Sequence, residues 1–124
     1  MLRDTDAVAT LGVKNLGTAA KFYGETLGLS RAGAEDDEVI VFESGDTKIN
    51  VYRSSFAGTN QATALTWAVD DVHDVVRTLK AKGVTFEHYD LPNTRREGDV
   101  HISGDIKVAW FKDPDGNILS VVNH

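Results

Sequence analysis

The side chains best suited to chemistry are His88 and His101, which flank the polar segment 91–99. An imidazole titrates near neutral pH, so either histidine could act as a general acid or base. Such a histidine is usually oriented by a carboxylate, and Asp90 and Asp99 are the nearest candidates. A histidine in a loop is more often an ordinary surface residue. The two histidines therefore form a candidate site whose chemistry the local sequence leaves open.

Other chemistries are excluded by composition and by motif. The chain has no cysteine, so thiolate metal ligands, a cysteine nucleophile and disulfides are all absent. It contains neither a phosphate-binding glycine loop nor a serine nucleophile elbow. The formal net charge of -6 opposes binding to nucleic acid or to an anionic membrane. We therefore expect a soluble, cytoplasmic protein with neither of those partners.

Residue patterns predict how these side chains are positioned. With 124 residues and 41% hydrophobic content, we expect one folded domain over 1–124. Alternation and helical periodicity predict a first module over 5–53. Its strand 7–13 precedes a helix over 16–27 that Asn15 caps and Gly28 ends. Strands 29–32, 39–42 and 48–52 follow, with an acidic turn at 35–38.

The second half repeats the order of the first. A small, polar connector spans 54–63, and the second module spans 64–124. A strand at 64–69 precedes a helix that Asp71 caps and Gly83 ends. Further strands are predicted at 84–89, 107–111 and 117–122, with a loop at 91–99 and a tight turn at 113–116. The pattern predicts an α+β fold of two βαβββ modules.

Three motifs resemble those of the vicinal oxygen chelate superfamily, whose members include glyoxalase I, extradiol dioxygenases and the fosfomycin- and bleomycin-resistance proteins. They are the segments 13–16 (VKNL), 20–29 (AKFYGETLGL) and 110–117 (WFKDPDGN). The resemblance is closest to metal-free members of the bleomycin-resistance type. It implies that the two modules form a half-barrel around a cleft. It fixes the expected fold well and the expected chemistry poorly.

The resemblance also implies where a metal would bind. Metal-dependent members take one ligand from the first strand and one from the last strand of each module. The matching positions here are Val8, Asn50, Ala64 and Ser120. Because valine and alanine donate nothing and the other two are weak neutral donors, we predict that no metal binds there and that no cofactor is required.

Strand parity predicts the residues that line the cleft. Small side chains form its floor, and Trp110 is the candidate aromatic wall, although a tryptophan there could equally be core filler. Trp67 has the opposite parity and is assigned to the core, and His73 and His124 are expected to be solvated. The predicted ligand-binding residues are Thr10, Asn50, Tyr52, Thr66, His88, His101, Trp110 and Ser120.

Three functions remain open. The first is a binding protein that sequesters an aromatic or cationic organic molecule in a metal-free cleft, without catalysis. The second is a metal-independent enzyme that uses His88 or His101 with Tyr89 or Arg53. The third is a metalloenzyme with relocated ligands such as His88, His101 and Asp99. The resemblance and the uncovered sheet edges further predict a homodimer.

Overall fold

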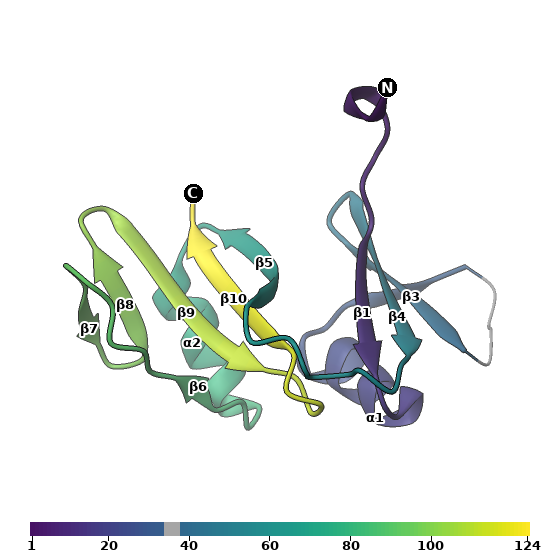
Figure 1. Ribbon diagram of the computed structural model, residues 1–124. Helices are drawn as coiled ribbons and strands as arrows, with labels where there is room; N and C mark the ends of the chain where they lie inside the picture. Colours follow the sequence, from purple (N-terminus) through teal and green to yellow (C-terminus); the bar gives the residue numbers. More distant parts are fainter. Residues whose placement is uncertain (34–37) are drawn as a thin grey trace. The chain divides into compact units, whose positions relative to one another are not determined.

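The protein consists of two compact units, residues Met1–Gly58 and Thr59–His124. The computed structural model describes residues 1–33 and 38–124 (Figure 1). Residues 35–37 of the acidic turn predicted at 35–38 lie outside the described residues. Each unit has its own sheet and its own helix, and each is described separately below.

Unit 1 is a four-stranded sheet covered by one helical segment. The strand order is β1-β4-β3-β2, with β1 and β4 parallel and the other pairs antiparallel. Its elements are η1 (Leu2–Asp4), β1 (Ala9–Val13), α1 (Leu16–Ala20), η2 (Lys21–Thr26), β2 (Ser30–Ala32), β3 (Val39–Ser44) and β4 (Thr47–Arg53).

The helical segment of unit 1 follows from its cap and its apolar face. Asn15 accepts a hydrogen bond from the Thr18 backbone N–H at 3.0 Å, as expected of a helix N-cap. After α1 the hydrogen bonding changes to the wider π-helical pattern of η2. Gly28 then adopts a φ of 77°, which favours glycine and ends the helix. The buried Tyr23 ring packs against Phe42 of β3. The predicted helix is confirmed.

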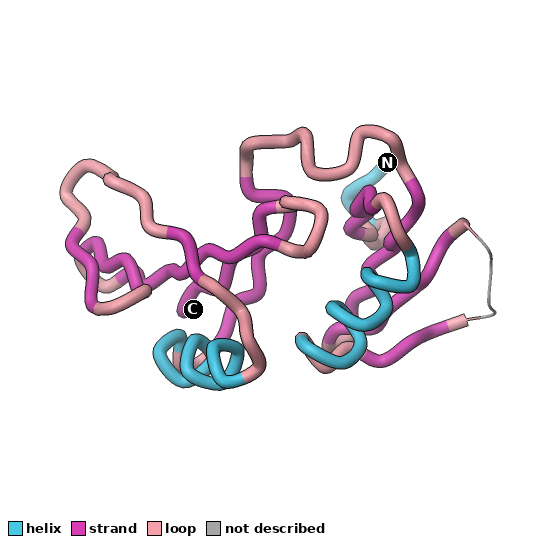
Figure 2. The backbone as a smooth tube through the Cα atoms, turned by 90° about the horizontal axis from the view of Figure 1, so that it is seen from below, coloured by secondary structure: helices cyan, strands magenta, loops and turns pink. Residues whose placement is uncertain are grey.

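Unit 2 has the same order of elements with two short additions. Its strand order is β5-β10-β9-β8-β7, and the short strand β6 also pairs with β9. The helix α2 packs against β8, β9 and β10 on one side of the sheet (Figure 2). The elements are β5 (Thr63–Val69), α2 (Val72–Ala81), β6 (Phe86–Glu87), β7 (Arg95–Glu97), β8 (Val100–Ser103), β9 (Ile106–Lys112) and β10 (Ile118–Asn123).

The two sheets share one topology. In each unit the first strand lies parallel to the last, and the two strands before the last follow in antiparallel order. The path β5-β10-β9-β8 therefore matches β1-β4-β3-β2. This arrangement confirms the predicted α+β fold built from two βαβββ modules.

The segment between α2 and β9 differs from the sequence-based prediction. The expected strand at 84–89 is reduced to Phe86–Glu87, and the expected loop at 91–99 contains strand β7. Strand β8 was not predicted at all. Four residues give only a short stretch of alternation, which indicates a strand weakly, whereas pairing with β7 and β9 stabilises one.

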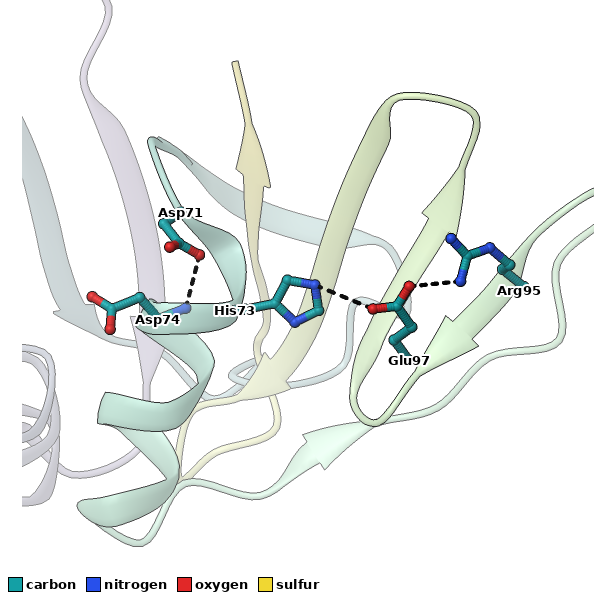
Figure 3. Close-up of polar contacts among 5 residues, drawn as sticks. All are labelled: Asp71, His73, Asp74, Arg95 and Glu97. Atoms are coloured by element: carbon teal, nitrogen blue, oxygen red, sulfur yellow. Dashed lines mark hydrogen bonds and ion pairs between the residues drawn. The ribbon is translucent and has the colours of Figure 1, made fainter.

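The environments of Trp67 and His73 differ from those expected from parity and periodicity. Trp67 is only half-buried, and its ring stacks on that of Phe111 with centroids 6.5 Å apart. His73 is not simply solvated, because its Nε2 lies 3.8 Å from Oε1 of Glu97 on β7 (Figure 3). Glu97 also accepts a hydrogen bond from Arg95. The contact between His73 and Glu97 links α2 to the edge of the sheet.

Candidate ligand site on the second sheet

Three of the predicted site residues lie on unit 1. Thr10 of β1 is the register partner of Asn50 on β4, and Tyr52 is the partner of Gly12. Thr10 and Tyr52 are exposed, whereas the alternating residues Leu11 and Val51 are buried. The predicted strand parity holds here, so these three side chains share the sheet face opposite the core.

Three further predicted residues form a row across unit 2. Ser120 of β10 is the register partner of both Thr66 on β5 and Trp110 on β9. The hydroxyl oxygens of Thr66 and Ser120 are hydrogen-bonded at 2.7 Å, and Ser120 is buried. The Trp110 indole Nε1–H donates to the Thr63 hydroxyl at 3.1 Å. Trp110 is half-buried and lies on the face opposite its buried neighbours Ala109 and Phe111.

The residues at the inferred metal positions do not fit a divalent ion. Val8 and Ala64 carry no donor atom, and Asn50 offers only a neutral amide. The Ser120 hydroxyl is already paired with that of Thr66. Among residues 1–33 and 38–124, no three histidine or carboxylate side chains converge as a metal site would require. We therefore derive no chemical step from a metal at these positions.

An aromatic cluster lies beside the row formed by Thr66, Ser120 and Trp110. The His101 ring on β8 makes edge contacts with Trp110 at a centroid separation of 4.9 Å, and Trp110 in turn contacts Tyr89 at 5.2 Å. Tyr89 and His101 are 6.2 Å apart, which closes a triangle of three rings. We call Tyr89, His101 and Trp110 the ring cluster. Such edge contacts fix the orientation of each ring.

His101 is the buried member of the ring cluster, with 1% of its surface exposed. Its Nε2 accepts a hydrogen bond from the Tyr89 backbone N–H at 3.0 Å, so Nε2 carries no proton in this arrangement. Its Nδ1 is buried without a hydrogen-bond partner among the described residues. Burial is the largest influence on the pKa of His101 and lowers it, and the nearby charge of Arg96 acts in the same direction, against a smaller raising effect of backbone hydrogen bonding. His101 is therefore neutral at physiological pH.

His88 has a different environment from that of His101. Its Nε2 lies 2.7 Å from Oδ1 of Asp99, and Nζ of Lys80 lies 2.7 Å from the other carboxylate oxygen. These two contacts, with Lys80 the larger cause, hold the pKa of Asp99 below its usual value. Asp99 thus orients His88, as the sequence suggested, while Asp90 does not. The ring of His88 remains about half-exposed.

A cavity of about 230 Å³ borders Tyr89 and His101 of the ring cluster. Within unit 2 it is lined by Tyr89, Asp90, Leu91, Thr94, Arg95, Arg96 and His101. Arg95 Nη1 donates to Glu97 at 2.6 Å, so its charge is largely balanced. Arg96 has no ion-pair partner among the described residues, and neither has Asp90. The cavity therefore combines aromatic surface with two uncompensated charges.

The structure thus brings together Thr66, Ser120, Trp110, His88 and His101 in one unit, with Thr10, Asn50 and Tyr52 grouped in the other. Sequence reasoning missed Thr63, because it ends a connector without any periodicity. It named Tyr89 only as a possible catalytic partner of the histidines, and it assigned neither Tyr89 nor Arg96 to the ligand site. The alternation of Val100, His101 and Ile102 was the available sign that His101 belongs to a strand.

Comparison with known proteins gives a family match over residues 6–121. The model of the glyoxalase/bleomycin resistance protein/dioxygenase superfamily matches residues 6–121. A glyoxalase family protein from Enterococcus faecalis has a TM-score of 0.74 at 18% identity, covering 98% of this chain and 99% of that one. The bleomycin resistance determinant encoded on transposon Tn5 has a TM-score of 0.73 at 20% identity, covering 96% and 97%.

A lactoylglutathione lyase from Agrobacterium tumefaciens is similar over 97% of this chain and 93% of its own, with a TM-score of 0.69 at 16% identity. At such identities the similarity establishes the fold alone. No helix within the described part of the chain is both long and apolar enough to cross a membrane. From the family match over residues 6–121, the chain belongs to the glyoxalase/bleomycin resistance protein/dioxygenase superfamily.

Proposed function

We propose that this protein binds and sequesters a small organic molecule with a planar aromatic group, in a site that contains no metal. The observation that supports this most directly is the ring cluster of Tyr89, His101 and Trp110 beside a cavity of about 230 Å³. Small-molecule sites typically combine aromatic walls with a few polar groups in this way. The similarity to a bleomycin resistance determinant also supports a binding function.

The chemistry of the ring cluster favours binding over catalysis. The Nε2 atom of His101 already accepts a backbone hydrogen bond, and the whole residue is buried. A general acid or base needs a ring nitrogen within hydrogen-bonding reach of the substrate. His101 instead holds the Tyr89 backbone in place and presents its ring to Trp110. It is therefore a structural part of an aromatic wall.

Truncation of Trp110 tests this proposal. We expect Trp110→Ala to weaken binding of the neutral planar probe 2-naphthamide by at least tenfold, because Trp110 packs against Tyr89 and His101, the two rings that line the cavity. Trp67→Ala is the matched control, since Trp67 stacks on Phe111 on the helix side of the sheet. That variant should lose stability and keep its affinity. Dissociation constants come from NMR titrations, with denaturant unfolding measured in parallel.

Each variant keeps one of the two tryptophans, so its remaining indole N–H signal reports on one known ring. In the wild-type protein the Trp110 signal should shift on titration and the Trp67 signal should not. The proposal fails if 2-naphthamide shifts neither signal, or if Trp67→Ala weakens binding as much as Trp110→Ala does.

A second candidate function is metal-independent proton transfer, and the contact between His88 and Asp99 favours it. A carboxylate 2.7 Å from Nε2 orients the ring and leaves Nδ1 as the atom that could exchange a proton with a substrate. Turnover of a bound compound that disappears in His88→Ala, with binding intact, would favour this function over sequestration.

We also propose that the chain is a cytoplasmic homodimer. The support is the edge strand β7, whose three residues are all exposed and whose outer side pairs with no strand in the described part of unit 2. Such edges are commonly covered by another chain. Sedimentation equilibrium should give twice the chain mass of 13.5 kDa at micromolar concentration. A monomer mass under those conditions would refute the homodimer.

A further inference from the structure

We infer that the molecule bound beside the ring cluster is an aromatic acid whose carboxylate is held by the guanidinium of Arg96. This inference rests on the proposed binding function and names the chemical class of its ligand. It specifies an anionic aromatic ligand, whereas the sequence analysis had left open an aromatic or a cationic one.

Register places Arg96 next to the ring cluster. Arg96 of β7 is paired directly with His101 of β8, so the two side chains leave the sheet on the same face. Both residues line the cavity together with Tyr89. The charge of Arg96 is also close enough to help lower the pKa of His101. A guanidinium is therefore fixed by strand pairing beside the aromatic wall.

The remaining charges around the cavity are mostly balanced. Arg95 is paired with Glu97 at 2.6 Å, and Figure 3 shows Glu97 between Arg95 and His73. Near His88, the carboxylate of Asp99 is balanced by Lys80 at 2.7 Å. His101 is neutral. The two charges left for a ligand are those of Arg96 and Asp90, and neither has an ion-pair partner in the described part of the chain.

The positions of Arg96 and Asp90 indicate which of these two charges a ligand stacked on the rings would meet. A cationic aromatic ligand would stack on the rings, but the strand register already places the guanidinium of Arg96 next to them. A carboxylate in the same place accepts two parallel hydrogen bonds from the planar guanidinium. Asp90 lies outside the strands, on the segment between β6 and β7, where the register does not fix it beside a ring. The cavity therefore suits an anionic group better than a cationic one.

Three probes with the same naphthalene ring test the inference on the full chain: 2-naphthoate, 2-naphthamide and 2-naphthamidine. We expect 2-naphthoate to bind at least tenfold more tightly than either of the others. Arg96→Gln should reduce its affinity to that of 2-naphthamide and should lower the 2-naphthamide affinity by a much smaller factor. Dissociation constants come from NMR titration at low ionic strength, because added salt screens the attraction.

Two further variants serve as controls. Arg95→Gln removes the same charge from the neighbouring position of β7, but Arg95 is occupied by Glu97, so 2-naphthoate affinity should fall less than threefold. Asp90→Asn removes a carboxylate from the cavity and should leave 2-naphthoate binding equal or tighter. An equal loss in Arg95→Gln and Arg96→Gln would show a general charge effect and overturn the role of Arg96.

The outcomes separate this inference from the proposed function. Tightest binding of 2-naphthamidine, weakened by Asp90→Asn, would overturn the anionic ligand and leave the aromatic site intact. Equal binding of all three probes that depends on Trp110 but not on Arg96 would do the same. If none of the probes binds to the wild-type protein, both the proposed function and this inference are refuted.

Discussion

Replacing Asp113 by alanine is expected to lower the free energy of unfolding by about 3–5 kcal/mol, because a buried carboxylate that accepts several hydrogen bonds is removed. Asp113 is 4% exposed and lies in the turn between β9 and β10. Its Oδ1 accepts from the backbone N–H groups of Asp115 and Asn117, at 3.0 and 2.9 Å. Its Oδ2 accepts from the side-chain amide of Asn117 at 2.8 Å.

The expected loss of unfolding free energy is large because the donors of Asn117 cannot form hydrogen bonds to water instead. Asn117 is itself buried, so alanine at position 113 removes the acceptor that Asp113 gives its backbone N–H and the one that it gives its side-chain amide. Asp105→Ala is the matched control, since Asp105 is an exposed aspartate in the turn between β8 and β9. Urea unfolding should show a change within about 0.5 kcal/mol for that control. A similarly small change for Asp113→Ala would refute the prediction.

This turn also explains why the family motif predicts fold better than chemistry. The segment 113–117 (DPDGN) is a network in which one carboxylate organises the connection between the two central strands of unit 2. None of these three hydrogen bonds involves the ring cluster. Proteins with different activities can share the motif because it stabilises the hairpin that all of them need.

His101→Ala is the second substitution with a large expected effect, a loss of about 3–5 kcal/mol of unfolding free energy. The variant leaves a cavity beneath Tyr89 and Trp110 and removes the acceptor of the Tyr89 backbone N–H. His101→Phe keeps a ring of similar size and removes both the Nε2 acceptor and the buried Nδ1, so it should cost less, about 1–3 kcal/mol. Denaturant unfolding at pH 7.5 measures both. Equal losses in the two variants would show that ring packing contributes little.

The burial of His101 also predicts a pH dependence. Burial lowers the pKa of His101 in the folded protein below its ordinary value of 6.5. As the pH falls below about 6.5, the unfolded chain binds a proton at this residue before the folded protein does. The stability contributed by neutral His101 is therefore present above pH 6.5 and decreases as the pH falls toward the lowered folded pKa.

The comparison of the wild-type protein with His101→Phe isolates this effect, because the other three histidines are present in both proteins. The difference in unfolding free energy between them should shrink when the pH is lowered from 7.5 to 5.5. A difference that grows over this range would mean that folded His101 gains a proton more readily than the unfolded chain. That result would contradict the assignment of a neutral, buried ring.

Local sequence determined the helices and the overall architecture. Asn15 and Asp71 cap the helices that follow them, and Gly28 and Gly83 adopt positive φ at their ends. These features depend on residues within about four positions of one another, so the sequence displays them directly. The alternation of apolar residues likewise identified the long central strands and the repeat of βαβββ units.

The candidate site was decided by pairing between distant segments. Residues 95–97 contain no apolar residue, and they form a strand because they pair with β8. That pairing sets Arg96 opposite His101, and the pairing of β8 with β9 brings His101 to Trp110. The sequence named both histidines and Trp110 as candidates. Only the register of β7, β8 and β9 made His101 a buried, neutral ring beside the guanidinium of Arg96, because register depends on long-range contacts that no local pattern encodes.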